Sequence, residues 1–516
     1  MFYMQDGALY AGFRTVWADW AAHLAYANVF AYRPMHDWFA HNPLFFPGRF
    51  SYPFLADLIS GLLMRVGFST VTAFVLPSIV TTLCLLAALL IFYRGALGTH
   101  GRAALALTLL LCGGGLGFWY FIQDFLHSGM TALWFPPQEY TYLPDRHIEL
   151  INIITSELLP QRSLLLGMAV GIAWLSVMLR WQRRGFSGVF YWQVATMGLV
   201  AASMVVIHDH SLLALGVICA VLALFSWRCW RHWLTLLVTT VIPGATIFFY
   251  LHRHHELQGF FAWYPGWLTH PDEHNEIGWL HFWWLNAGLL LPLAVLGIVR
   301  RRTWRQPLVI AGVVLFALVN LIRFQPWAWD NTKLLTWSFL LLIIPVTEVL
   351  AALWSYQRLA RVASVMLVLS LCASGGLDLW RLAHRDRVSV LLWDTQDVRL
   401  AAEFRKISAP DAMVLCADDH HHWVTSLAGR QVIMSYPGWL FSYGIDYSAV
   451  APDLVHLFTG DAASARLLAQ YQIKFAVIGP AERALYKVNQ RYFDAHFPVV
   501  LDDGRTRVYA VTPANN

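Results

Sequence analysis

Four polar clusters interrupt an otherwise apolar sequence, and each contains residue types that serve in catalysis or binding. The first lies in the segment TVWADWAAHLAYANVF at 15–30. Asp19 and His23 are four residues apart in it, so they lie on one face of a helix. A carboxylate and an imidazole are common groups in general acid–base chemistry. The alternative is that both lie on the solvent-exposed face of a surface helix.

A second cluster, RFQPWAWDNTK, lies at 323–333 between two apolar stretches. Its cations Arg323 and Lys333 could bind the phosphate of a lipid, and Asp330 places a carboxylate beside them. The tryptophans could stack on a sugar ring. The alternative is a belt of interfacial aromatic residues with a snorkelling lysine. A run of Asp, Asn and Lys goes beyond what such a belt requires.

The third cluster is the segment QEYTYLPDRHIELINIITSELLPQRS at 138–163. Glu139 and Arg162 are its candidate binding residues, and Arg162 directly precedes an apolar stretch, where it could contact a phosphate. The segment could form the acceptor side of a cleft. It could also be a solvated loop whose charges only confer solubility.

The fourth cluster is His208, Asp209 and His210, at a break between two apolar stretches. Ionisable residues at membrane depth are costly and usually functional. The three could bind a metal, but side chains at i and i+2 diverge on a helix. We therefore expect hydrogen bonding inside a cavity, and expect the three consecutive histidines at 420–422 not to converge on a metal either.

Composition indicates that these clusters belong to a membrane protein. Of 516 residues, 58% are hydrophobic and only 13% are charged, whereas soluble domains carry about 25% charged residues. A membrane-spanning helix needs about 20 apolar residues. Ten stretches are candidates: 71–93, 102–122, 164–180, 189–207, 211–226, 233–250, 279–299, 306–322, 334–354 and 361–377.

The arginines predict the orientation of these spans. Alternate loops carry Arg94 and Arg102; Arg180, Arg183 and Arg184; Arg228 and Arg231; Arg300, Arg301, Arg302 and Arg305; and Arg358 and Arg361, with no acidic residue. The positive-inside rule places these loops in the cytoplasm of a cell with an inner (cytoplasmic) membrane. The four polar clusters and both chain ends then face outward. An even number of spans with both ends outside requires the N-terminus to cross the membrane, so we expect one further span upstream of residue 1. The alternative is an N-terminus that is translocated without a signal.

The last 136 residues are more highly charged than the rest, because they contain 28 of the 67 charged residues of the chain. Short apolar runs at 412–417, 431–436 and 473–480 are typical of buried strands, and 397–407 and 463–472 of helices, with a hairpin over 499–511. We therefore predict three parts: residues 1–70 as an outward-facing loop with two interfacial helices (15–32 and 54–67), 71–378 as the membrane domain, and 379–516 as a small extracytoplasmic α/β domain.

An outward loop of two interfacial helices, with Asp19 near its start and the Tyr-Pro-containing entry HNPLFFPGRFSYP (41–53) to its second helix, resembles the GT-C glycosyltransferase fold. Protein O-mannosyltransferases, aminoarabinose transferases and oligosaccharyltransferases share this plan. The resemblance implies a polytopic α-helical membrane protein in which Asp19 acts as base, or holds a divalent metal such as Mg²⁺ or Mn²⁺, beside the phosphate of a lipid-linked donor. His23, Arg162, Arg323, Lys333, Asp330, Glu139, His208 and Asp209 are the expected substrate-binding residues.

The predicted function is transfer of a sugar from a polyprenyl-phosphate donor to a glycan, lipid or protein acceptor at the outer membrane face. No nucleotide-binding or hydrolase motif is present, and no nucleic-acid partner is expected. The alternatives are a transporter or flippase of lipid-linked saccharides and a non-catalytic scaffold for envelope assembly. The enzyme interpretation requires Asp19 to face a cavity shared with the segments 138–163 and 323–333.

Overall fold

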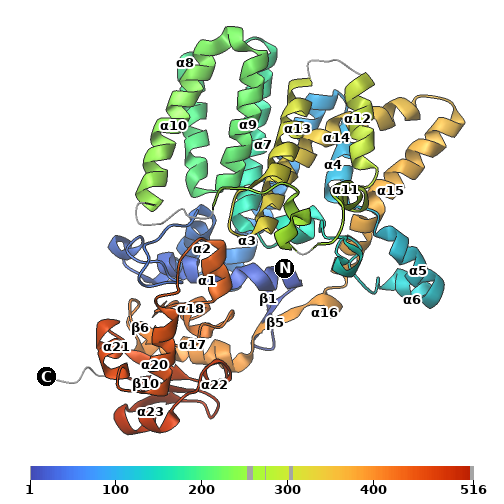
Figure 1. Cartoon of the computed structure of the whole chain (residues 1–516). Helices are drawn as coiled ribbons and strands as arrows, with labels where there is room; N and C mark the ends of the chain where they lie inside the picture. The colour runs from blue at the N-terminus through green and yellow to red at the C-terminus, as the bar shows by residue number, and fades with distance from the viewer. Residues whose placement is uncertain (1, 253–259, 274, 301–305, 512–516) are drawn as a thin grey trace.

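The computed structural model describes residues 2–252, 260–273, 275–300 and 306–511. A layer of long apolar helices forms one end of the molecule, and an α/β domain forms the other (Figure 1). The segment that carries Asp19 lies between them. The chain is thus a polytopic α-helical membrane protein with a small C-terminal α/β domain, as the sequence predicts.

Five helices in the described residues are long and apolar enough to cross a membrane. Three are α3 (Thr70–Leu97), α7 (Arg162–Arg183) and α15 (Arg358–Ala383). The other two are Trp227–His252, which includes α10 (Trp230–His252), and Ala328–Trp354, which includes α14 (Thr332–Trp354). The helices α11 (Trp279–Ala287) and α12 (Leu290–Arg300) form a sixth apolar unit, bent by 92°. Shorter apolar helices are α4 (His100–Leu111), α8 (Tyr191–Ala202), α9 (Asp209–Phe225) and α13 (Gln306–Leu321). Each predicted span contains one of these units.

The predicted span at 102–122 is wrong as a single helix. Helix α4 ends at Leu111, and a separate helix α5 (Phe118–Ser128) begins after a glycine-rich turn and leads into α6 (Met130–Trp134). A Cβ atom at Gly115 would lie 2.0 Å from the carbonyl oxygen of Leu285, and one at Gly117 would lie 1.7 Å from that of Tyr140. The chain turns here because only glycine permits these backbone contacts.

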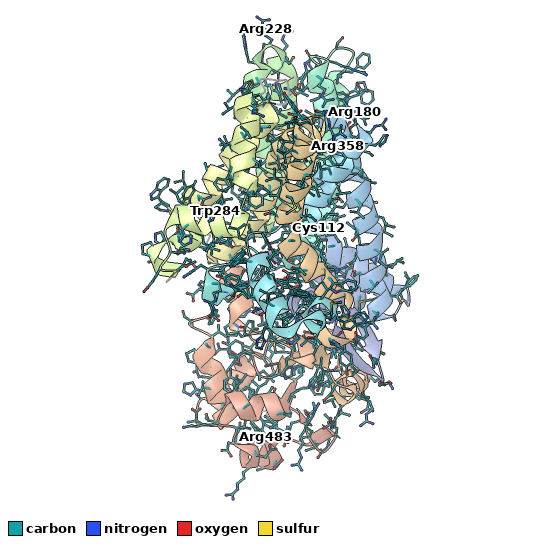
Figure 2. The ribbon with its side chains drawn as sticks, turned by 90° about the vertical axis from the view of Figure 1, so that its right-hand side faces the viewer. Cys112, Arg180, Arg228, Trp284, Arg358 and Arg483 are labelled. Atoms are coloured by element: carbon teal, nitrogen blue, oxygen red, sulfur yellow. The ribbon has the colours of Figure 1, made fainter. Side chains whose placement is uncertain are left out.

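The arginine-containing loops gather at one end of the membrane helices. Figure 2 shows Arg180, Arg228 and Arg358 at the end opposite to Arg483 of the C-terminal domain. Three arginines that entered the orientation argument, Arg301, Arg302 and Arg305, lie outside the described residues. The described arginines of these loops therefore lie at one end of the molecule. The side of the membrane on which that end lies stays a prediction.

The N-terminal region begins with a hairpin, β1 (Phe2–Gln5) and β2 (Ala8–Ala11), followed by α1 (Arg14–Tyr32) and α2 (Leu55–Arg65). Helix α1 forms where predicted. Trp20 is 2% exposed and Tyr26 is 1% exposed, whereas Trp17 is 36% exposed. Most of α1 therefore packs inside the protein, and the interfacial position of the segments 15–32 and 54–67 stays a prediction.

The C-terminal domain begins with α16 (Arg385–Val388) and β5 (Val390–Trp393), which pairs antiparallel with β2. A second sheet has the order β7-β6-β8-β10-β9. Its strands are β6 (Met413–Leu415), β7 (Gln431–Val432), β8 (Phe475–Ile478), β9 (Val499–Asp502) and β10 (Arg507–Ala510); the helices are α17 (Thr395–Ile407), α18 (Trp423–Ser426), α19 (Pro437–Ser442), α20 (Ala451–Thr459), α21 (Ser464–Gln470), α22 (Pro480–Leu485) and α23 (Gln490–His496). The predicted strands, helices and hairpin of this domain are confirmed.

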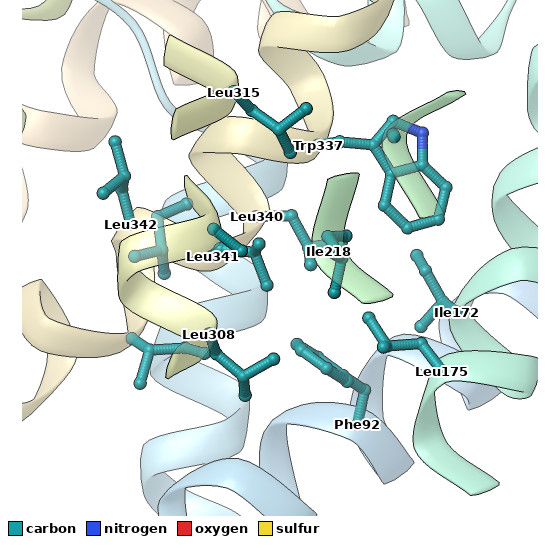
Figure 3. Packing of buried hydrophobic residues seen from close by; sticks show 14 of the residues in the cluster. Phe92, Ile172, Leu175, Ile218, Leu308, Leu315, Trp337, Leu340, Leu341 and Leu342 are labelled. Atoms are coloured by element: carbon teal, nitrogen blue, oxygen red, sulfur yellow. The ribbon is translucent and has the colours of Figure 1, made fainter. Parts of the chain in front are cut away.

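Two hydrophobic cores hold the molecule together. One joins the membrane helices around α14, where Trp337 and Leu340 face Ile172 of α7 and Ile218 of α9 (Figure 3). The other joins the N-terminal region to the C-terminal domain. Each core therefore packs together residues from distant parts of the chain.

Candidate active site

A cavity of about 2160 Å³ lies between the two cores. Its walls come from α1, the segment 142–163, helices α8 to α10, the segment 324–333 and the C-terminal domain at 419–421 and 436–443. Asp19 lines this cavity together with Gln161 and Lys333. The arrangement that the enzyme interpretation requires is therefore present.

Asp19 is half-buried on α1 and held by the segment opposite. Gln161 Nε2 donates a hydrogen bond to Asp19 Oδ2 at 2.8 Å. Burial raises the pKa of Asp19, and the nearby His23 and Lys333 offset part of that rise. A carboxylate with a raised pKa at a cavity wall is suited to accepting a proton.

His23 lies one turn further along α1 and also lines the cavity. Its Nδ1 atom is 2.9 Å from the carboxylate of Asp57 on α2, and Arg162 Nη1 is 2.8 Å from the same carboxylate. Asp57 is 0% exposed, and a second guanidinium nitrogen of Arg162 bonds to Ser60. Arg162 is thus engaged in a buried ion pair and stands behind the cavity lining, not at the surface where a phosphate contact was predicted.

The sequence-based search did not select Asp57. The available signal was a carboxylate within the apolar segment FLADLISGLLMRVG at 54–67. A buried carboxylate requires partners, but nothing in the sequence identifies the partners as residues 34 positions before and 105 positions after it.

Lys333 and Asp330 lie together at the head of α14 and line the cavity. Lys333 Nζ is 2.9 Å from Asp330 Oδ1, and Ser442 of the C-terminal domain donates to Asp330 Oδ2 at 3.2 Å. Close to them, burial raises the pKa of Glu157 to about 7. Arg323 is set apart, with its guanidinium 4.9 Å from the centre of the Tyr264 ring.

His208, Asp209 and His210 all line the cavity at the start of α9. His208 Nδ1 accepts a hydrogen bond from the backbone of Ser211 at 3.2 Å and so caps the helix. The rings of His208 and His210 are 5.5 Å apart. Across the part of the chain that the structure describes, no three His, Cys, Asp or Glu side chains are grouped so that they could hold a metal. The residues present therefore do not fit a three-ligand site for Mg²⁺ or Mn²⁺.

Glu139 has a positioning contact at the edge of the site. Arg14 donates to both oxygens of Glu139, at 2.7 and 2.8 Å. Arg14 lines the cavity and Glu139 lies behind it. The bidentate pair fastens the segment 138–163 to the start of α1, five residues before Asp19.

The C-terminal domain covers the cavity through two segments, 419–421 and the aromatic run at 436–443. His420 stacks on Trp17 of α1 with ring centres 4.6 Å apart, and Trp439 Nε1 donates to the carbonyl of Ala18 at 3.3 Å. Burial and the neighbouring His421 lower the pKa of His420 to about 3, so its ring is uncharged. These two contacts hold Trp17 and Ala18, the residues directly before Asp19, against the C-terminal domain.

An apolar arm of the cavity extends from the polar end between α8, α9 and α10. Leu213, Gly216, Leu237, Val241 and Phe249 are among its lining residues. On α9 the lining runs from Leu212 to Ala223, which corresponds to about 17 Å of helix at 1.5 Å per residue. One cavity thus joins a group of ionisable side chains to a long apolar channel.

This combination of membrane helices, an N-terminal helix that carries Asp19 and a C-terminal α/β domain is similar to the GT-C fold. ArnT from Cupriavidus metallidurans in the apo state is similar over 98% of this chain and 96% of its own, at 13% identity and a TM-score of 0.51. The resemblance read from the sequence is confirmed at the level of the fold.

Other solved structures are similar at lower scores. ArnT bound to undecaprenyl phosphate has 12% identity over 97% of this chain and 95% of its own, with a TM-score of 0.47. The oligosaccharyltransferase of Archaeoglobus fulgidus, tethered with an acceptor peptide, has 11% identity and a TM-score of 0.49 over 90% of this chain. This chain spans only 65% of that enzyme. No protein-family model and no curated protein sequence matches the chain.

Proposed function

We propose that the protein is a glycosyltransferase that moves a sugar from a polyprenyl-phosphate donor to an acceptor at the outer face of a cytoplasmic membrane. The observation that carries this proposal is the single cavity that joins Asp19 to the apolar arm between α8, α9 and α10. A substrate that is polar at one end and a long hydrocarbon at the other fits this shape. ArnT has been solved with undecaprenyl phosphate, a ligand of this class.

In the proposed reaction, Asp19 accepts the proton of an acceptor hydroxyl or amide group. The acceptor atom forms a bond to the anomeric carbon of the sugar while the bond from that carbon to the phosphate oxygen breaks. Polyprenyl phosphate leaves with the electron pair of the broken bond. Lys333 and His208, which line the polar end, are placed to contact the phosphate, and the hydrogen bond from Gln161 holds Asp19 in place.

Within this proposal the buried ion pair has a supporting role. Arg162 and Asp57 fix His23 Nδ1, which leaves the opposite edge of the imidazole for the cavity that His23 lines. Arg323 and Glu139 act indirectly, through Tyr264 and Arg14.

The decisive experiment measures turnover of radiolabelled polyprenyl-phosphate sugars by the purified protein. We expect the wild type to release polyprenyl phosphate and Asp19→Asn to lose at least about 100-fold in rate, the usual contribution of a general base. Asp411→Asn, an exposed carboxylate of the C-terminal domain, is the matched control and should retain full turnover. Equal rates for Asp19→Asn and the control would exclude Asp19 as the base.

A second variant tests the apolar arm. Gly216 lines the cavity on α9, and a Cβ atom there would meet nothing within 4 Å. Gly216→Leu should therefore fold normally but obstruct the lipid chain and raise KM for the donor. Gly101→Leu on α4, where a Cβ atom also meets nothing within 4 Å, is the control. Normal turnover with an unchanged KM in Gly216→Leu would place the lipid elsewhere. Transport of the lipid-linked sugar without any transfer would favour the flippase alternative.

A further inference from the structure

A second hollow of about 690 Å³ lies far from Asp19, between the α5–α6 hairpin and α15. All its lining residues are apolar or glycine: Phe118, Phe121, Ile122, Met130, Leu133, Trp134, Ala373, Gly376, Leu377 and Trp380. The hairpin stands out from the helix bundle beside the C-terminal end of α15 (Figure 1). Trp380 Nε1 donates to the carbonyls of Leu133 and Trp134, which holds hairpin and helix together around the hollow.

The outward surface of the hairpin is also apolar. Trp119 is 60% exposed, Leu126 is 78% and Met130 is 70% exposed. The opposite side of α5 is polar, where Asp124 accepts a hydrogen bond from Gln138 at 2.8 Å. An amphipathic hairpin that follows a membrane span, with exposed tryptophan, is typical of a segment in the membrane interface. The hollow is thus in reach of bilayer lipids.

Three arginines follow the hollow in the chain, Arg381 on the last turn of α15 and Arg385 and Arg387 on α16. Leu377 and Trp380 line the hollow, and Arg381 follows one turn after Leu377 on the same helix face. The guanidiniums of Arg381 and Arg387 lie 4.5 and 5.1 Å from the centre of one ring, that of Phe135. Arg385 and Arg387 are exposed. Among the described residues, no carboxylate forms an ion pair with any of the three.

We infer that the hollow and these arginines form a binding site for a bilayer phospholipid with an anionic headgroup. The hollow receives an acyl chain, and Arg385 and Arg387 contact the headgroup phosphate. Arg387 shares the Phe135 ring with Arg381, and Arg385 lies over the Tyr3 ring with its guanidinium 4.2 Å from the ring centre. A phosphate at this cluster of like charges supplies the opposite charge that the protein does not. The site is separate from the proposed active site and does not depend on the proposed reaction.

The test uses native mass spectrometry of the full-length protein incubated in detergent with phosphatidylglycerol or phosphatidylcholine. We expect the wild type to retain phosphatidylglycerol in preference. The double variant Arg385→Ala/Arg387→Ala should lose that preference, by about fivefold per arginine. Arg399→Ala/Arg466→Ala removes two exposed charges elsewhere in the domain and should behave as the wild type.

A third variant tests the acyl chain. A Cβ atom at Gly376 would meet nothing within 4 Å, so Gly376→Leu should fold normally and fill the hollow, with weaker retention of phosphatidylglycerol than in Gly101→Leu. Equal retention of the two lipids by the wild type would overturn the proposal, as would full retention by either variant. Competition by glycerol 3-phosphate as strong as that by the lipid would show a free-phosphate site instead.

Discussion

Gln161 Nε2 lies 2.8 Å from Asp19 Oδ2, and this hydrogen bond joins residues 142 positions apart in the chain. It brings the end of the segment 138–163 onto α1 at the carboxylate that the proposed reaction uses. The same segment is fastened to α1 by the pair of Arg14 and Glu139. The position of Asp19 is therefore set by the contact between α1 and the segment 138–163, not by α1 alone.

The hydrogen bond from Gln161 favours the ionised form of Asp19, while burial opposes it. A base must be deprotonated to act, so transferase activity should fall as pH decreases through the raised pKa of Asp19. Gln161→Ala should shift this acidic limb of kcat/KM to higher pH. The measurement is the pH profile of donor turnover. An unchanged limb in Gln161→Ala would show that the hydrogen bond does not tune the base.

Removing only one partner of the buried pair of Asp57 and Arg162 should destabilise the protein more than removing both. Arg162→Met leaves the Asp57 carboxylate without its cation and should lower the free energy of unfolding by about 3–5 kcal/mol. The double variant Asp57→Leu/Arg162→Met removes both charges and should be much closer to the wild type. Thermal unfolding of the purified protein in detergent distinguishes the two. A phosphate-binding role for Arg162 would instead appear as a raised donor KM in Arg162→Lys at unchanged stability.

The pair of His422 and Glu482 predicts how the stability of the outer domain depends on pH. The two side chains are 2.7 Å apart and buried. Burial alone would lower the pKa of His422, but Cys416 and Glu482 raise it well above its usual range. The stabilisation from His422 is therefore fully present below pH about 6.5, the pKa of an unfolded histidine. It is lost as pH rises through the higher folded pKa.

The measurement for His422 is the unfolding temperature of wild type and His422→Gln between about pH 6 and pH 9. This range of about three units begins just below the pKa of an unfolded histidine. The difference between the two should shrink as pH rises. His456→Gln removes a partner from the exposed pair with Asp461 and is the control, with an unfolding temperature close to that of the wild type. A difference that grows with pH would contradict the raised pKa.

The glycine turn after α4 gives a prediction about folding. Gly117→Ala places a Cβ atom 1.7 Å from the carbonyl oxygen of Tyr140, a backbone atom that cannot move aside without the loop around it. We expect a loss of folded protein in size-exclusion chromatography. Gly101→Ala on α4 meets no neighbour and should gain up to about 1 kcal/mol in helix propensity. Normal folding of Gly117→Ala would mean that the turn can rearrange.

The sequence by itself determined the elements of this protein. Apolar stretches of membrane-spanning length predicted where the apolar helices lie, although not the break between α4 and α5. The alternation of short apolar runs and helical segments after residue 380 predicted the order of elements in the α/β domain. These features are local, because hydrophobic periodicity and length depend only on neighbouring residues. The polar clusters at 15–30, 138–163, 208–210 and 323–333 were visible for the same reason.

The tertiary structure alone decided how these side chains pair. It buried Trp20 against Phe2 and Phe74, and it buried Tyr26 against Phe50 and Tyr52. It also joined Asp57 to His23 and Arg162, and brought His420 onto Trp17 across some 400 residues of chain. Charge pairing and burial depend on which distant segments meet, and a single sequence does not specify those contacts.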